Sequence, residues 1–129
     1  MKIVKGYPPN YDRIAEQFTL DSSVIFTYGD TIYVPGGGDL NKPLIIHESI
    51  HSKQQADMGI EKWWKNYFED EKFRLSQEVE AYRNQFVAYK GSVHSQVKIA
   101  VFLNGIAKDL SSDIYGNIIT LEEAIKLIV

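Results

Sequence analysis

The stretch PLIIHESIHSKQQAD, residues 43–57, contains the pattern H-E-x-x-H. On an α-helix, His47 and His51 are four residues apart, so they project from one face, one turn above the other. Two imidazoles at this spacing can both ligate a zinc ion at about 2.0–2.1 Å. Glu48 is rotated by about 100° around the helix axis, which places its carboxylate beside the ion. A general base for a zinc-activated water must stand there, so the pattern predicts a hydrolytic metal site.

The alternative is that these residues are ordinary polar positions of a surface or core helix. The apolar residues Leu44, Ile45 and Ile46 precede the pattern, and Ile50 continues a buried face through it. Polar side chains beside a buried stripe need partners, because their burial without hydrogen bonds is costly. We therefore favour a metal site over a solvated helix face.

The overall composition limits the class of protein. A length of 129 residues suits one domain, residues 1–129, with a single core. The net charge of −3 and the lack of a long basic run argue against nucleic acid as a partner. No apolar run reaches membrane-spanning length, and the N-terminal segment lacks the apolar region of a signal peptide. We therefore expect a cytoplasmic protein, in a host cell or a virion, without a membrane partner.

Short strands are predicted near the N-terminus. Lys2–Lys5 alternates apolar and polar residues, as an edge strand does. Val24–Thr27 and Thr31–Val34 are rich in β-branched and aromatic residues, and they flank the turn signal Tyr28-Gly29-Asp30. We predict an antiparallel β-hairpin here, directly before the H-E-x-x-H helix.

Helices are predicted over most of the remaining chain. The first helix begins near Asn10, the second runs from Pro43 to a stop at Gly59, and the third begins near Glu61. The fourth runs from Phe73 to Lys90, and the fifth begins after a cap at Ser92. The last covers the LEEAIKLI segment after a capping box at Thr120. These elements predict an α+β fold that is mostly helical.

The apolar positions of these helices predict the core. The buried residues are expected to be Ile14, Ala15 and Phe18 in the first helix, the stripe Leu75, Val79, Tyr82 and Phe86, and Val93, Val97, Ala100, Val101 and Leu103 in the helix after Ser92. The aromatic residues Trp63, Trp64, Tyr67 and Phe68 are expected to be mostly core, with a smaller share facing a cleft or a partner.

A hydrolytic zinc site needs a third protein ligand, and the choices downstream are Asp57, Glu78, Glu80 and His94. Glu78 lies about 60° from the apolar stripe of its helix, at the edge of the buried face, whereas Glu80 lies about 140° away, toward solvent. The alternative role for Glu78 is a boundary charge paired with a lysine or arginine.

Asp57 follows the second histidine by six residues, the ligand spacing of peptidases that carry a glycine three residues after that histidine. Gln54 occupies the glycine position here, and a helix that continues through it directs Asp57 away from the ion. His94 stands alone on another predicted helix, where a surface or capping role is more common. Glu78 is therefore the preferred third ligand.

His47, Glu48 and His51, followed on a later helix by Glu78 and Ala81 in the form E-x-x-A, resemble the gluzincin branch of zinc metallopeptidases. The string from His51 to Gln55 is similar to the H-E-x-x-H-x-x-Q-Q variant of compact predicted peptidase domains of bacteria and phages. This resemblance covers roughly residues 24 to 86 and implies a minimal zincin-like fold.

The resemblance implies that His47, His51 and Glu78 ligate Zn²⁺ and that Glu48 is the general base and then the general acid. It also implies that the hairpin supplies an edge strand along which a peptide lies extended. Many gluzincins carry an aspartate four residues after the third ligand, where it supports a histidine, but Tyr82 stands here. The open choices for stabilising the oxyanion are Tyr28, Tyr33, Tyr82, Arg83 and Tyr89.

The leading hypothesis is a zinc-dependent peptidase that acts on a protein or peptide substrate. The second is a non-catalytic binding or assembly protein of a phage or mobile element, built on the same scaffold, with exposed aromatic residues near Trp63 as its partner surface. A deformylase-like amidase is disfavoured, because deformylases use a cysteine as third ligand and this chain has no cysteine.

Overall fold

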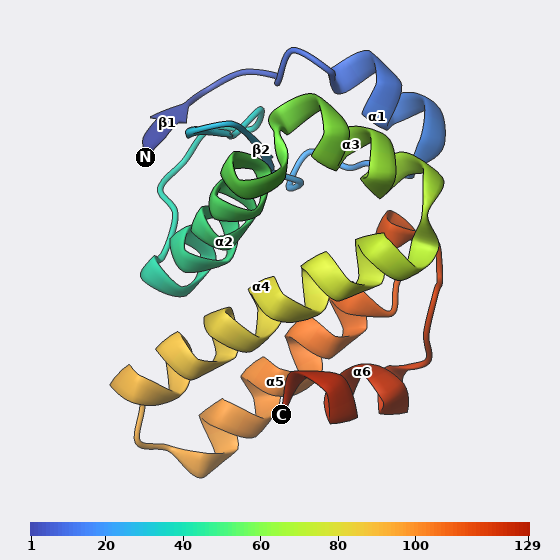
Figure 1. The fold of residues 1–129 in the computed structure, drawn as a ribbon. Coiled ribbons are helices and arrows are strands. Elements are labelled where there is room, and N and C mark those ends of the chain that lie inside the picture. The colour runs from blue at the N-terminus through green and yellow to red at the C-terminus, as the bar shows by residue number, and fades with distance from the viewer.

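Six α-helices and a three-stranded sheet make up the computed structural model, which describes residues 1–129 (Figure 1). In chain order the elements are β1 Lys2–Val4, α1 Tyr11–Gln17, β2 Phe26–Tyr28, β3 Thr31–Tyr33, α2 Lys42–Met58, α3 Ile60–Glu69, α4 Glu71–Ser92, α5 Gln96–Leu110, the 3-10 turn η1 Asp113–Tyr115, and α6 Leu121–Ile128. The predicted α+β class is confirmed. None of the helices is both long enough and apolar enough to cross a membrane.

The sheet has the strand order β1-β3-β2. Strands β2 and β3 form the predicted antiparallel hairpin, with Tyr28 opposite Thr31 across a turn of two residues. Gly29 opens this turn with φ 64°, a left-handed conformation that glycine adopts without strain. Strand β1 pairs with β3 in parallel, so the sheet is mixed rather than purely antiparallel.

The helix that carries the H-E-x-x-H pattern is α2, and its ends follow local capping chemistry. The Asn41 side chain accepts a hydrogen bond from the backbone N–H of Leu44, and Pro43 occupies the first turn. Gly59, with φ 99°, ends α2 where the sequence predicted and lets the chain turn directly into α3. Helix α2 therefore runs unbroken through Gln54 and Gln55.

Helix α4 lies at the centre of the molecule, with α2 on one side and α5 and α6 on the other (Figure 1). Its apolar side contributes Tyr82 and Phe86 to a core shared with α5 and α6. The adjoining side, which faces α2, carries the buried polar residues Arg74, Glu78 and Gln85. A helix buried on two sides need not be apolar on both, because buried polar groups can pair with one another.

A second apolar core joins α1, the hairpin and α3. It is formed by Ile14, Phe18, Phe26, Trp63, Trp64 and Tyr67. The prediction that the aromatic residues of α3 are mostly core is confirmed. The expectation of an exposed aromatic partner surface near Trp63 is wrong, because Trp63 is only 2% exposed and Trp64 8%.

Three further predictions are wrong, namely the cap of α5, the buried face of α5 and the burial of Ala15 in α1. Helix α4 extends to Ser92, and Ser95 rather than Ser92 caps α5 by accepting from the N–H of Lys98. Val97 and Val101 are 74% and 67% exposed, and Ala100 between them is exposed as well. The reason is that α6 packs against the C-terminal half of α5, whose buried residues are Ile106, Ala107 and Leu110. Ala15 of α1 is also exposed.

Candidate metal site

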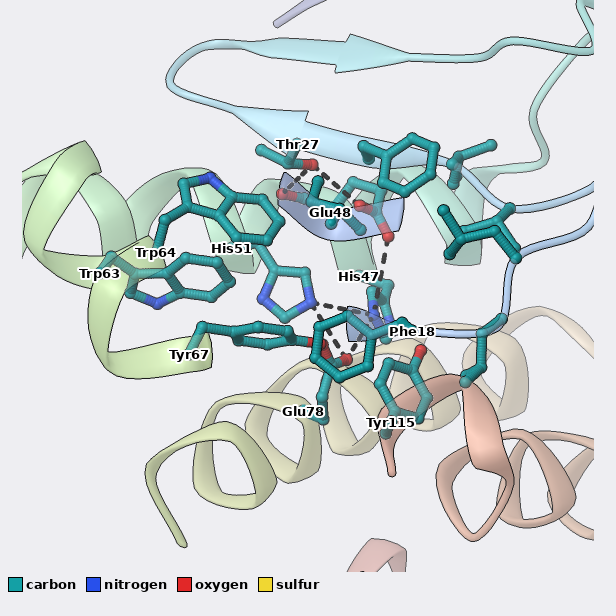
Figure 2. Close-up of a pocket in the computed structure, with 16 residues that line it drawn as sticks. Phe18, Thr27, His47, Glu48, His51, Trp63, Trp64, Tyr67, Glu78 and Tyr115 are labelled. Carbon is teal, nitrogen blue, oxygen red and sulfur yellow. Dashed lines mark hydrogen bonds and ion pairs between the residues drawn. The ribbon is translucent and has the colours of Figure 1, made fainter. Parts of the chain in front are cut away.

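Two turns of α2 meet one turn of α4 at a buried cluster of three side chains (Figure 2). His51 Nε2 lies 3.2 Å from His47 Nε2 and 3.1 Å from Glu78 Oε1. His47 Nε2 lies 3.2 Å from the same carboxylate oxygen. The structure thus brings together the two histidines of the pattern and the acid preferred from the sequence.

The spacing of these three atoms fits a small metal ion. A tetrahedral ion with bonds of about 2.0–2.2 Å to nitrogen and oxygen separates its ligand atoms by about 3.3–3.6 Å. The observed separations of 3.1–3.2 Å come close to this range before any ion draws the side chains into place. His47, His51 and Glu78 therefore form a group that could bind a metal ion.

Two glutamines orient the histidine rings. Gln85 Oε1 lies 2.8 Å from His47 Nδ1, and Gln54 Oε1 lies 2.9 Å from His51 Nδ1. The Gln54 amide nitrogen donates to the Gln77 carbonyl and to a Glu80 carboxylate oxygen, which fixes the orientation of that amide. Because an amide oxygen only accepts, this arrangement places a proton on each Nδ1 and leaves each Nε2 to a metal ion once one is bound.

The contacts of these glutamines with the histidine rings were not predicted from the sequence. Position 82 holds no acidic partner, and the Tyr82 ring instead packs edge-on against His47, with the ring centroids 4.4 Å apart. A helical signal was available: Gln85 follows Glu78 by seven residues and so shares its face. Gln54 follows His51 by three residues on the same face of α2.

The second oxygen of Glu78 is also held. The Tyr67 hydroxyl donates to Glu78 Oε2 at 2.6 Å, so the two carboxylate oxygens have separate partners. Burial and the negative charge of Glu78 raise the pKa of Tyr67 well above its ordinary value, so this phenol stays protonated as a donor. The Glu78 carboxylate is thereby fixed with Oε1 toward the histidines.

Charge couples His51 to Glu78. Burial by itself would lower the pKa of His51, but the charge and hydrogen bond of Glu78 outweigh it and raise the pKa to about 9. Burial would raise the pKa of Glu78, and the two histidines instead hold it well below its usual range. In the metal-free protein at neutral pH, a proton on His51 therefore balances Glu78, and a metal ion must displace that proton.

Glu48 lies beside the cluster without belonging to it. Its Oε2 is 3.6 Å from His47 Nε2, and its Oε1 accepts a hydrogen bond from Thr27 Oγ1 at 2.8 Å. The residue is only 5% exposed. A carboxylate placed beside a metal cluster rather than in it has the position required of a proton acceptor.

A cavity of about 70 Å³ adjoins these groups, and eleven of the sixteen residues around it are hydrophobic. Phe18, Phe26 and Trp64 contribute apolar walls, and Tyr115 of η1 closes one side (Figure 2). Arg74 holds this cover by donating to the Tyr115 carbonyl at 2.9 Å. The site is therefore shielded from bulk water, which strengthens electrostatic interactions inside it.

The other acids and the third histidine considered from the sequence lie outside the cluster. Asp57, Glu80 and His94 are exposed. Glu80 acts only at a distance, through its hydrogen bond with Gln54.

None of the five residues considered for the oxyanion lines the cavity. The Tyr28 hydroxyl donates to Glu61, the Tyr89 ring stacks on Phe102, and Arg83 is exposed. Tyr33 packs at the edge of the core formed by α1, the hairpin and α3. The Tyr82 and Tyr115 hydroxyls are hydrogen-bonded to each other. The tyrosines that do line the cavity are Tyr67 and Tyr115, neither of which was considered for the oxyanion from the sequence.

Comparisons with protein-family models, with curated proteins and with solved structures find no match to this chain. The resemblance to gluzincins therefore rests on the sequence motifs described above and on the arrangement of His47, His51 and Glu78 with Glu48 beside them.

Proposed function

We propose that this chain is a zinc-dependent peptidase. The observation that carries the proposal is the convergence of His47 Nε2, His51 Nε2 and Glu78 Oε1, with a carboxylate oxygen of Glu48 3.6 Å from one of them. Three protein ligands and a nearby carboxylate are the minimal parts of a hydrolytic zinc centre.

Zinc is the metal that this donor set suits best. Two neutral imidazoles and one carboxylate are the ligands of catalytic zinc in several peptidases, and they leave one coordination position open. Calcium and magnesium prefer sites built from oxygen atoms, which this cluster does not offer. The hydrogen bonds from both Nδ1 atoms to glutamine favour the tautomer that such a site requires.

Each side chain then has a distinct role. His47, His51 and Glu78 hold the ion, which when bound activates a water molecule and polarises the peptide carbonyl. Glu48 accepts the proton of the attacking water at Oε2 and later gives it to the leaving nitrogen. The apolar cavity wall excludes other water from the reaction.

A second candidate function is a non-catalytic binding or assembly protein with a structural metal. The observation that favours it is burial, because His47, His51 and Glu78 are only 3–5% exposed. Structural zinc sites are closed, whereas catalytic sites keep a position for water and substrate. The cavity beside Glu48 is the reason we rank this candidate second.

One experiment separates the two. Wild type and Glu48→Gln are purified without added metal, their zinc content is measured by atomic absorption, and both are incubated with a mixed peptide library that is read by mass spectrometry. We expect about one zinc per chain in both proteins. Wild type should cleave peptides at least about a hundredfold faster than Glu48→Gln. Equal cleavage by Glu48→Gln would refute the mechanism. Zinc-loaded wild type that cleaves nothing would favour the structural alternative.

A further inference from the structure

Strand β2 contacts Glu48, beside the candidate metal site, through one hydroxyl. Thr27 Oγ1 donates to Glu48 Oε1 at 2.8 Å and lies 3.4 Å from the Glu48 carbonyl oxygen (Figure 2). Both residues are buried, at 3% and 5% exposure, so water does not compete for this contact.

Gln55 fixes the position of Thr27. Its side chain is fully buried; its Oε1 accepts from the N–H of Gly29 at 2.7 Å, and its Nε2 donates to the Thr27 carbonyl at 2.9 Å. The hairpin register turns the Thr27 carbonyl away from β3, so the Gln55 amide takes the place that a neighbouring strand would occupy. Gln55 of α2 thereby fixes strand β2, and Thr27 of that strand contacts Glu48 of the same helix.

This pairing also limits where an extended peptide could lie along the hairpin. The edge of β2 at Thr27 and Gly29 is already occupied by Gln55 and cannot pair there with an extended peptide.

We propose that Thr27 is the positioning residue of the general base. Its hydroxyl occupies Oε1 of Glu48, so the carboxylate presents its other oxygen, Oε2, toward His47 Nε2 at 3.6 Å. A carboxylate without this contact rotates about its last side-chain bond, a broad torsion, and spends less time in the productive orientation. The inference rests on the proposed peptidase function.

The kinetic test compares three variants on the fastest-cleaved library peptide. Thr27→Val keeps the shape and removes the hydroxyl, Thr27→Ser keeps the hydroxyl, and Thr31→Val is the matched control. Thr31 is a buried threonine of the same hairpin whose hydroxyl contacts only Asp30. We expect Thr27→Val to lower kcat by about 10–100-fold with KM and zinc content unchanged, because small misplacements of a catalytic group cost this much. Thr27→Ser should restore most of the rate, and Thr31→Val should match wild type.

An unchanged kcat in Thr27→Val, or a Thr27→Ser variant as slow as Thr27→Val, would overturn the inference.

A measurement without catalysis separates the Thr27 inference from the proposed function. In metal-free protein, the effects of Thr27→Val and Glu48→Leu on the urea midpoint should be less than additive, whereas those of Thr31→Val and Glu48→Leu should add. Additivity of the first pair would overturn the Thr27 inference, whereas zinc-loaded wild type that cleaves no peptide would overturn the peptidase proposal instead.

Discussion

His51 Nε2 lies 3.1 Å from Glu78 Oε1, although 27 residues separate the two along the chain. The contact joins α2 to α4, the two helices that pack most extensively against each other. It brings a nitrogen donor and an oxygen donor to one point in the protein interior, where neither can be left unpaired. The predictions below start from this contact.

Glu78→Gln is expected to remove zinc binding. The amide lacks the charge that balances the ion, so we expect affinity to fall by more than about 100-fold. Asp57→Asn is the control, because Asp57 carried the alternative ligand assignment and is exposed. Competition with a chromogenic chelator measures both affinities, and equal loss in the two variants would contradict the assignment of Glu78.

Gln85→Leu is expected to weaken zinc binding without removing a ligand. The variant leaves His47 Nδ1 without its acceptor at 2.8 Å, so the ring loses its fixed tautomer and orientation. Loss of such a partner costs about 10–100-fold in metal affinity. Gln85→Glu keeps an acceptor oxygen and should retain affinity near that of wild type. If Gln85→Leu binds zinc as tightly as wild type in the same chelator assay, the orienting role is excluded.

The metal-free protein is expected to lose stability as the pH rises. The pKa of His51 is raised from 6.5 to about 9 in the folded protein, so the folded state binds the proton more tightly than the unfolded state. The resulting stabilisation is fully present below about pH 6.5 and is lost as the pH rises through about 9. Urea midpoints measured in the presence of a chelator should fall across this window. Glu78→Gln should flatten the dependence, since the charge of Glu78 raises this pKa.

The two halves of α5 are expected to differ in their contribution to stability. Leu110 is 1% exposed in the core with α4 and α6, so Leu110→Ala should cost about 2–5 kcal/mol. Val97 is 74% exposed, so Val97→Ala should change stability by less than about 0.5 kcal/mol. Urea unfolding of both variants measures the difference. A large loss of unfolding free energy in Val97→Ala would show that Val97 is buried, as the sequence predicted.

Local patterns in the sequence were enough to predict several elements. Pro43 in the first turn and Gly59 at the end mark the limits of α2, and the turn at Gly29 makes the hairpin, because each depends only on nearby residues. Glu78 was preferred because its angle to the apolar stripe is a property of one helix. The buried face of α5 does follow helical spacing, through Ile106 and Leu110. It was predicted wrongly because the predicted stripe began at Val93, which lies before α5.

The sequence alone determined that His47 and His51 share one face of a helix with Glu48 beside them, since helical geometry relates residues a few positions apart. Only the tertiary structure decided which acid completes the cluster, that Gln85 and Gln54 orient the rings, and that Thr27 holds Glu48. These contacts join different elements, and their distances follow from how α2, α4 and the hairpin pack. The physical reason is that a helix fixes the direction of each side chain relative to its own axis, whereas the packing of buried surfaces determines what that side chain meets.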